Sequence, residues 1–369
     1  MAGGKARIDK PLAILIALLV GGGLIIFASA IFGPLARGAS NISSVAFNHL
    51  ALGVGVGLVA LLIATTINYR TWRRFAPHLF IAALAVTALV FVPSLGFEHG
   101  GGRRWLVIAN MSFQPSEALK MGTIFIAAAY FSAVRARMGD IRYSLGGLFA
   151  ILAAPTVLLI LQPDLGTLGI MVFSVLAIFV VAGARFRDIA ITICIGLLAI
   201  AVLAMLRPYV LDRVTTFLDP SQNPQAEGYQ IRQSLIAIGS GGFAGRGFGQ
   251  SVQKFTYLPE PMGDSIFAIA GEEFGFVGAV SIIGLFLGFA LRGIAVASRA
   301  SDLFGGLLAV GIVTYLTIEA FINIAGMLGV APLTGVPLTF ISQGGSAMLI
   351  SLFAAGILLN ISKYKSRSG

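Results

Sequence analysis

An aspartate at the entrance to a long apolar segment is the strongest candidate for chemistry in this sequence. Asp264 ends the polar stretch 207–264, and the apolar run 264–291 starts at the same point. A positioned carboxylate can take a proton from a weak nucleophile such as a hydroxyl, which makes Asp264 a candidate general base. The simpler interpretation is an N-cap, because aspartate often accepts hydrogen bonds from the first turn of a helix. Position alone leaves both interpretations open.

Other ionisable residues lie inside apolar segments, where a charge is costly and is therefore a candidate for function. Glu117 and Lys120 are three residues apart on one expected helix face. They can form an ion pair that is either structural or substrate-facing. Asp164 opens another apolar run and is first of all a candidate N-cap.

Three glutamates follow further along the apolar runs. Glu272 and Glu273 come about two helical turns after Asp264, or roughly 12 Å at 1.5 Å per residue. They lie about 80° and about 180° around the expected helix from Asp264, so at most one of them can share its pocket. Glu319 is predicted either to pair with Lys120 or to support a loop.

Basic residues and helix starts accompany the polar stretch. Arg103, Arg104, Arg246 and Lys254 lie in loops on the same predicted side as Asp264. Helix N-termini carry unpaired N–H groups and a partial positive charge, which favour anions such as phosphates. The sequence therefore predicts a site for an anionic ligand, and a diphosphate-bearing ligand is compatible with it.

The elements that must position these residues are membrane helices. The 369-residue chain is 57% hydrophobic and 11% charged, whereas soluble domains carry about 25% charged residues. We expect an all-α polytopic membrane protein that forms one membrane domain over residues 1–369. A large loop, 207–263, with a short amphipathic helix at about 227–238, should separate the seventh and eighth spans. About ten stretches approach the roughly 20 apolar residues needed to span: 12–32, 46–67, 79–95, 114–134, 145–161, 165–184, 188–206, 264–291, 305–327 and 342–362.

The distribution of basic residues predicts the orientation of these spans. Sixteen of the 25 Lys and Arg residues fall in one set of short loops and at the termini, and eight fall in the other set. By the positive-inside rule, both termini are cytoplasmic and the 207–263 loop is extracytoplasmic. The net charge of +10 is thus a topology signal and does not indicate a nucleic-acid partner.

Several other features carry little functional weight. The single cysteine, Cys194, lies in an apolar run, and the three histidines are scattered without zinc spacing. The glycine-rich run 239–249 lacks the ending of a P-loop and follows an expected helix instead of a strand. The segment 28–30 resembles a signal-peptide cleavage site, but we favour a retained first span because the preceding apolar run is long.

Motifs that are weak one by one occur in order along nearly the whole chain. They are GRRWL (102–106), FQPSEALK (113–120), QPDLGT (162–167) and the stretches 213–220, 228–249, 258–278 and 332–346. Together they resemble the SEDS proteins (shape, elongation, division and sporulation), which include FtsW, RodA and SpoVE. The resemblance is closer to FtsW than to RodA and implies the SEDS fold with ten spans.

The resemblance implies a peptidoglycan glycosyltransferase that joins lipid II disaccharides and releases undecaprenyl diphosphate. It places the essential acid of the family on Asp264. The family commonly has His-Thr before this acid, whereas this chain has Met262-Gly263, and Gln343 replaces its usual tyrosine. The candidate substrate-binding residues are Arg103, Arg104, Trp105, Glu117, Lys120, Arg246, Lys254 and Glu260. The candidate supporting residues are Asp164, Glu272 and Gln343.

The resemblance also implies partners and a location. A class B penicillin-binding transpeptidase and other membrane proteins of the divisome or elongasome are expected in the bacterial plasma membrane. The metal requirement is open, and a divalent cation, Mg²⁺ or Mn²⁺, can assist the leaving diphosphate. Two other functions fit the same residues. A lipid II flippase would use the intramembrane charges as a polar path, and a division scaffold would use the lipid-facing helix surfaces.

Overall fold

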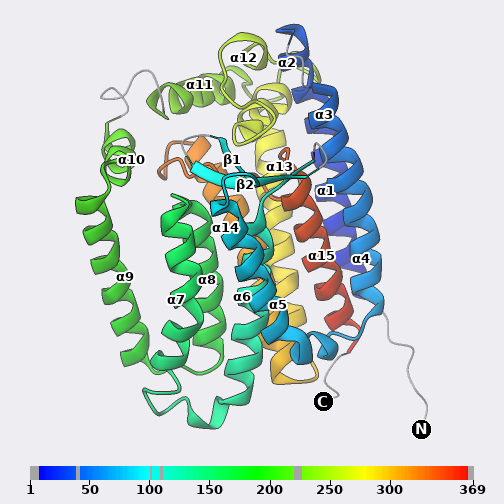
Figure 1. The fold of residues 1–369 in the computed structure, drawn as a ribbon. Coiled ribbons are helices and arrows are strands. Elements are labelled where there is room, and N and C mark those ends of the chain that lie inside the picture. The colour runs from blue at the N-terminus through cyan, green and yellow to red at the C-terminus, as the bar shows by residue number, and fades with distance from the viewer. Residues whose placement is uncertain (1–7, 39–41, 100–101, 109–110, 220–226, 365–369) are drawn as a thin grey trace.

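The computed structural model describes residues 8–38, 42–99, 102–108, 111–219 and 227–364. These residues are mostly helical, and the long helices stand side by side in one bundle (Figure 1). The long elements are α1 (Lys10–Ala30), α3 (Ile42–Phe47) continued by a π-helical stretch (Asn48–Val56) and α4 (Gly57–Thr66), α5 (Arg70–Ala88), α6 (Pro115–Ala133), α7 (Leu145–Leu161), α8 (Leu165–Val181), α9 (Phe186–Leu206), α13 (Ile266–Ser298), α14 (Leu303–Met327) and α15 (Gly345–Ser362).

Short elements connect the long helices. They are α2 (Phe32–Ala36), α10 (Pro208–Leu218), α11 (Glu227–Ser240), α12 (Gln253–Thr256), two 3₁₀ turns (Leu89–Phe91 and Arg135–Arg137) and three strands. The helix α11 covers the range where the sequence predicts a helix within the long loop.

The polytopic helical class is confirmed. Within the described residues, seven helical segments are long and apolar enough to cross a membrane. The helices α7 and α8 are also apolar but have 17 residues each, and α6 has 19 residues, two of them charged. Together these segments occupy the positions of the predicted spans. The exact number of ten spans stays a prediction.

The third predicted span, 79–95, is wrong at both ends. The helix α5 begins nine residues earlier, at Arg70, and ends at Ala88. Counting apolar residues misses its first turns because Arg70, Arg73 and Arg74 lie on them. The predicted span also extends too far at its other end, because the chain after α5 makes a 3₁₀ turn and then enters β1 (Gly96–His99).

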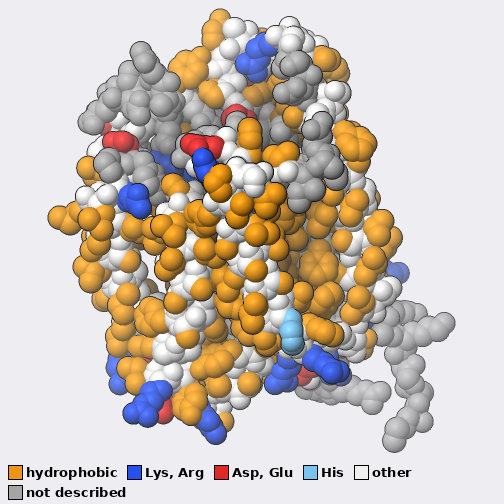
Figure 2. Space-filling view, viewed as in Figure 1, with side chains coloured by type: hydrophobic (Ala, Val, Ile, Leu, Met, Phe, Trp, Pro, Cys, Tyr) orange, Lys and Arg blue, Asp and Glu red, His pale blue; other side chains and the backbone are white. Residues whose placement is uncertain are grey.

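The bundle has two different ends. At the end that we call the loop end, α10, α11, α12 and the strands form a layer over the helices (Figure 1). At the opposite end, which we call the terminal end, the chain enters α1 and leaves α15. Hydrophobic side chains cover the sides of the bundle, and Lys and Arg side chains gather at the terminal end (Figure 2).

The first helix is held by the last part of the chain. Asp9 caps α1 by accepting from Leu12 N, and its carboxylate forms two hydrogen bonds of 2.8 and 2.7 Å with the Arg292 guanidinium. Ser362, at the end of α15, accepts a hydrogen bond from Asp9 N. A glycine also lets α1 approach the segment before α15, because a Cβ on Gly23 would collide with the Phe340 carbonyl.

A small antiparallel sheet at the loop end was not predicted. The strands β1 (Gly96–His99), β2 (Gly102–Ile108) and β3 (Met111–Phe113) lie in the order β1-β2-β3. Leu106 is the central residue, since it pairs with Gly96 on one side and Phe113 on the other. The sheet fills the connection between α5 and α6, and β2 carries three of the predicted site residues, Arg103, Arg104 and Trp105.

The long helix α13 is broken near its start. Gly275 has φ 64° and ψ −160°, a conformation that no helix contains and that favours glycine. Residues 266–274 are therefore a separate helical segment of about 13 Å. The following residues, 276–298, reach about 34 Å, which is enough to cross a bilayer without the first segment.

Candidate active site

The turn that carries Asp264 is held through its backbone. Asn323 of α14 donates to the Asp264 carbonyl at 2.9 Å and also binds the Val336 carbonyl at 2.8 Å. Ser342 Oγ donates to the Gly263 carbonyl at 2.7 Å, and Gln343 N donates to the Met262 carbonyl at 2.7 Å. Three successive carbonyls of the turn thus have partners on α14 or the segment before α15, which fixes the backbone and leaves the Asp264 side chain available.

The N-cap interpretation of Asp264 does not hold. The residue that precedes α13 is Ser265, and no side chain caps this helix. Among the described residues, no group donates a hydrogen bond to the Asp264 carboxylate. Glu260, which begins the turn, has φ 44°, an uncommon backbone conformation for a residue with a side chain. Such backbone strain persists only where the surrounding structure imposes it.

A shallow pocket opens beside Asp264, between the end of α14 and the loop that follows it. Its empty space, which includes the solvent at its open mouth, is about 150 Å³. Gly335 has φ 68°, and a Cβ at this position would lie 3.6 Å from Asp264 Oδ2. The lining residues are Asp264, Ile322, Asn323, Gly326, Met327, Leu333, Thr334, Gly335 and Val336. Most of this wall is apolar, so a group that enters the pocket meets few charged neighbours besides the carboxylate.

The surroundings of Asp264 favour its protonated form. Burial raises the pKa of Asp264 to about 7, and the nearby negative charge of Glu260 acts in the same direction. The positive charges of Arg213 and Arg104 oppose this shift of the pKa. A carboxyl group with a pKa near 7 can accept a proton near neutral pH and release it again, which is what general base catalysis requires.

Arg104 reaches the site from the small sheet. Its guanidinium donates to the Gln162 carbonyl at 3.2 Å and to the Pro163 carbonyl at 2.5 Å, at the junction of α7 and α8. Asp164 follows directly and caps α8 as predicted, accepting from Thr167 N. Arg104 therefore links the sheet to this junction while its charge acts on Asp264.

Glu117, Lys120 and Glu319 form one buried cluster in the bundle. Lys120 Nζ lies 3.0 Å from Glu117 Oε1 and also contacts Glu319 Oε2. Tyr315 donates to Glu117 at 3.2 Å, and the Lys120 ammonium lies 4.6 Å from the centre of the Tyr315 ring. Of the two predictions for Glu319, pairing with Lys120 is the correct one. Glu319 is one helical turn from Asn323, so α14 connects this cluster to the Asp264 turn.

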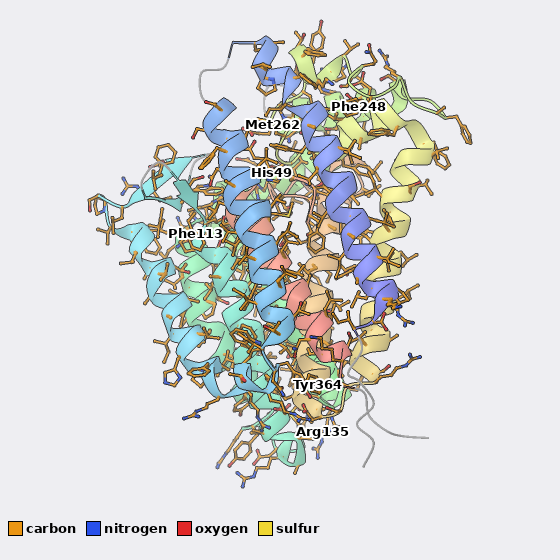
Figure 3. The ribbon with its side chains drawn as sticks, turned by 90° about the vertical axis from the view of Figure 1, so that its right-hand side faces the viewer. His49, Phe113, Arg135, Phe248, Met262 and Tyr364 are labelled. Carbon is orange, nitrogen blue, oxygen red and sulfur yellow. The ribbon has the colours of Figure 1, made fainter. Side chains whose placement is uncertain are left out.

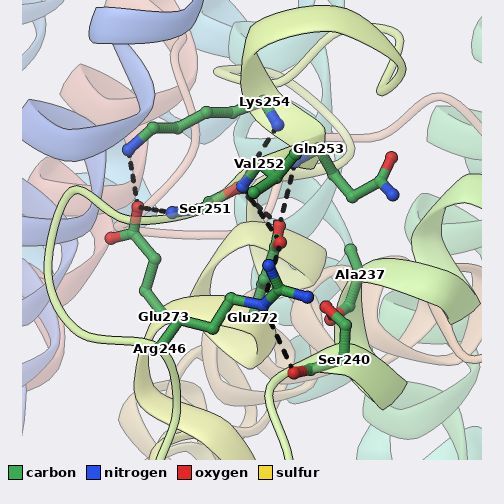
Figure 4. A network of polar contacts seen from close by, with 9 residues as sticks. All are labelled: Ala237, Ser240, Arg246, Ser251, Val252, Gln253, Lys254, Glu272 and Glu273. Carbon is green, nitrogen blue, oxygen red and sulfur yellow. Dashed lines mark hydrogen bonds and ion pairs between the residues drawn. The ribbon is translucent and has the colours of Figure 1, made fainter.

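The remaining basic candidates lie elsewhere. Lys254 is completely buried and bonds to Glu273 at 2.6 Å (Figure 4). Arg246 lies 3.6 Å from Glu272 and is partly exposed. The structure thus separates Arg246, Lys254 and Glu272 from Asp264. Arg246 and Lys254 were predicted to bind substrate and Glu272 to support the site, and in the structure all three take part in contacts of the loop with Glu272 and Glu273 instead of contacting Asp264.

The other candidates lie at the surface or on the turn. Arg103 is exposed and pairs with Glu98 at 3.5 Å, and Trp105 is half-buried on β2. Glu260 is exposed at the start of the turn. Gln343 is half-buried and contributes its backbone N–H to the turn. Figure 3 places Met262 and His49 near the loop end, far from Arg135 and Tyr364 at the terminal end.

Sequence reasoning missed three residues that build the site: Asn323, Gly335 and Ser342. A signal existed for Asn323, which is a polar residue in an apolar run four positions after Glu319. Gly335 and Ser342 belong to the stretch 332–346, whose residues gave only a family resemblance. Among the described residues, no three His, Cys, Asp or Glu side chains come together as a metal site.

Known proteins match this chain over most of its length. A family of cell cycle proteins, the FtsW/RodA/SpoVE family, matches residues 10–367. Stage V sporulation protein E of Bacillus subtilis is 39% identical over 313 residues, which cover 85% of this chain and 86% of that protein. A probable peptidoglycan glycosyltransferase FtsW of Geobacter sp. is 37% identical over 310 residues, covering 83% of this chain and 84% of the relative.

Solved structures show the same fold. A chain of a peptidoglycan synthase complex, described for its structural coordination of polymerization and crosslinking, superimposes with a TM-score of 0.80 at 27% identity. The rod shape determining protein RodA of Thermus thermophilus gives a TM-score of 0.71 at 26% identity. Each comparison covers 98% of this chain and 99% of the other. The chain therefore belongs to the FtsW/RodA/SpoVE family.

Proposed function

We propose that this protein is a peptidoglycan glycosyltransferase that polymerises lipid II, with Asp264 as its general base. The observation that carries the assignment of Asp264 is its setting: a backbone fixed by three hydrogen bonds and a carboxylate that no described group neutralises by direct contact. The activity itself is supported by relatives named as probable peptidoglycan glycosyltransferases at 37% and 38% identity over 83% of this chain.

In the proposed reaction, a sugar hydroxyl of the acceptor attacks the anomeric carbon of the donor. The new carbon–oxygen bond forms as the bond from the anomeric carbon to the lipid diphosphate breaks, and the diphosphate leaves with that bonding pair. Asp264 takes the hydroxyl proton, because a neutral hydroxyl is a poor nucleophile. With a pKa of about 7, the protonated carboxyl can then return the proton to solvent.

Arg104 is the cation that we place closest to the developing negative charge. Its charge already acts on Asp264, and two carbonyls hold its guanidinium in place. Fixed donors that face a developing anion lower the barrier, since they need no reorganisation during the reaction. Asp264 and Glu260 also provide two carboxylates on one turn, the kind of donors that Mg²⁺ combines with substrate phosphates. No step above requires the ion.

We place the site on the extracytoplasmic side of the bacterial plasma membrane. The gathering of Lys and Arg at the terminal end supports this orientation (Figure 2), because short cytoplasmic loops are enriched in both residues. The loop end would then face outward, where lipid-linked sugars are polymerised. As partner we propose a class B penicillin-binding transpeptidase, on the basis of the related chain from a complex that combines polymerization and crosslinking.

The test compares Asp264→Asn with wild-type protein in lipid nanodiscs supplied with lipid II, with and without the transpeptidase. We expect wild-type protein to form glycan strands and Asp264→Asn to lose about 10²-fold or more of the rate, since a general base contributes typically 10²–10⁴-fold. Asp212→Asn, which changes an exposed acid of α10, is the control and should retain the wild-type rate.

Gel analysis of the glycan product decides the outcome. Full polymerisation by Asp264→Asn would refute the role of this residue. Transfer of intact lipid II between leaflets without any polymer from the wild-type protein would replace the enzyme with a flippase.

A further inference from the structure

Glu272 and Glu273 hold a loop at the far end of the short helical segment 266–274 (Figure 4). Glu272 accepts hydrogen bonds from Ser251 Oγ at 2.6 Å and from two backbone N–H groups, those of Val252 and Gln253. Glu273 accepts from Ser251 N at 3.3 Å and from the Lys254 ammonium at 2.6 Å. The two neighbouring carboxylates therefore both bind one short stretch of the loop, residues 251–254.

Backbone hydrogen bonds also join an earlier part of the loop, residues 242–247, to the break in α13. Arg246 N and Gly247 N donate to the carbonyls of Glu272 and Glu273 at 3.0 and 2.9 Å. Phe276 N, on the other side of the break, donates to the Gly242 carbonyl at 2.9 Å. Residues 242–247 thus provide hydrogen-bond partners for backbone groups that the break at Gly275 leaves without partners in the helix. This part of the loop and the break are therefore held together.

Lys254 joins this unit to the N-terminal part of the protein. Its ammonium lies 2.6 Å from Glu273 Oε1 and 2.8 Å from Ser29 Oγ, near the end of α1. Ser29 in turn donates to Glu273 at 2.6 Å. All three side chains are buried. On the same side, Gly33 of α2 packs against the Lys254 carbonyl without room for a Cβ.

Asp264 lies at the opposite end of the same rigid segment. Residues 266–274 form about 13 Å of helix, so the orientation of the end with Glu273 sets the orientation of the end beside Asp264. The chain from Lys254 also leads to Asp264 in ten residues, through the buried Leu258 and the Met262 carbonyl that Gln343 holds. The ion pair therefore acts on the Asp264 turn along two routes.

We propose that the buried junction of Lys254, Glu273 and Ser29 is a positioning element that sets the place of Asp264 against its pocket. Lys254 is a positioning residue in this proposal and does not contact substrate. The proposal rests on the proposed function, in which Asp264 is the general base. It differs from the sequence-based interpretation of Lys254 as a cation for the leaving diphosphate.

The test uses Lys254→Gln, Glu273→Gln and the double variant Lys254→Gln/Glu273→Gln in nanodiscs with lipid II. Each single variant should lower kcat about tenfold or more, while KM changes less than twofold, because substrate contacts are intact. The double variant should recover a large part of kcat, since two amides can hydrogen-bond to each other without an unpaired charge. The matched control is Asp9→Asn, which removes the charge from a part-buried ion pair with Arg292 at the terminal end. It should lower the melting temperature and leave kcat unchanged.

Hydrogen exchange supplies a readout that needs no catalysis. Amides in residues 258–274 should exchange faster in the two single variants and at the wild-type rate in Asp9→Asn. A higher KM with unchanged kcat would overturn the proposal and return Lys254 to the substrate site. Unchanged kcat and unchanged exchange well below the melting temperature would also overturn it. If wild-type protein forms no polymer, the proposed function fails, and the exchange data still decide whether the junction orders the Asp264 turn.

Discussion

The two ends of the short helix 266–274 carry acids with opposite settings. At its start, Asp264 has no donor to its carboxylate among the described residues, and the negative charge of Glu260 helps to raise its pKa. At its other end, Glu272 and Glu273 are fully buried and accept hydrogen bonds from side chains and backbone N–H groups. One short helix thus separates the carboxylate that we propose as the base from two carboxylates that hold the loop.

This difference shows how a membrane enzyme can divide its charges. A buried carboxylate with several donors is fixed and unreactive, because each donor stabilises the ionised form. Asp264 has no such donors in the part of the chain that the structure describes, and burial together with the charge of Glu260 raises its pKa to about 7, so it can exchange protons near neutral pH. Burial alone does not distinguish the proposed base, since the completely buried glutamates are the ones that hold the loop.

The largest expected effect on stability comes from removing a structural acid. Glu272→Ala leaves Ser251 and the N–H groups of Val252 and Gln253 without an acceptor. Each unsatisfied buried donor costs about 1–3 kcal/mol, so the free energy of unfolding should fall by about 3 kcal/mol or more. Unfolding in SDS measures the change. Glu98→Ala, an exposed acid on β1, is the control. A loss below 1 kcal/mol would mean that Glu272 is not a structural anchor.

An intermediate effect is expected from pH, which should change kcat through the protonation of Asp264. Asp264 must be deprotonated to act as a base, so kcat should rise with pH through a midpoint at about 7 and be about tenfold lower at pH 6 than at its plateau. Glu260→Gln removes the negative charge that raises this pKa, and the acid limb should shift to lower pH.

Profiles of kcat between pH 5.5 and 8 test this prediction. Glu98→Gln is the control, and its acid limb should have the same midpoint as that of the wild-type protein. A flat wild-type profile would contradict the assignment of Asp264 as the base.

The smallest effect on stability and on kcat is expected from Arg246, the partly exposed partner of Glu272. Arg246 lies 3.6 Å from Glu272, and its side chain is 41% exposed. Exposed ion pairs contribute about 0–1 kcal/mol, so Arg246→Gln should change the free energy of unfolding by less than 1 kcal/mol and kcat by less than twofold. A loss as large as that of Lys254→Gln would place Arg246 in the same buried junction.

The sequence predicts the helices well because their length and apolar composition are set by the bilayer. It also identifies Glu117 and Lys120 as a pair, since three residues bring side chains to one helix face. The position of Asp264 in the sequence fits both an N-cap and a base, and the family resemblance favours the base. These features depend on local spacing or on an ordered set of motifs, and both are visible in one chain.

The sequence did not reveal the contacts of the long loop. The angles assigned to Glu272 and Glu273 counted Asp264 as part of the helix, whereas α13 begins at Ile266, and the break at Gly275 follows both glutamates. Lys254 was counted as a surface cation because it lies in a polar stretch, but contacts with Ser29, far away in the sequence, bury it. The small sheet was missed because its strands are short, with four, seven and three residues.

The ion pair of Asp9 with Arg292 and its hydrogen bond to Ser362 have a consequence for synthesis in the cell. A ribosome releases α1 into the membrane long before it makes α13 and α15, the helices that hold α1. The first helix must therefore wait in the lipid without its partners until the last residues are translated. The packing of α1 is then completed only late in synthesis, and a truncated chain that lacks α15 would leave α1 incompletely packed and exposed to quality-control proteases.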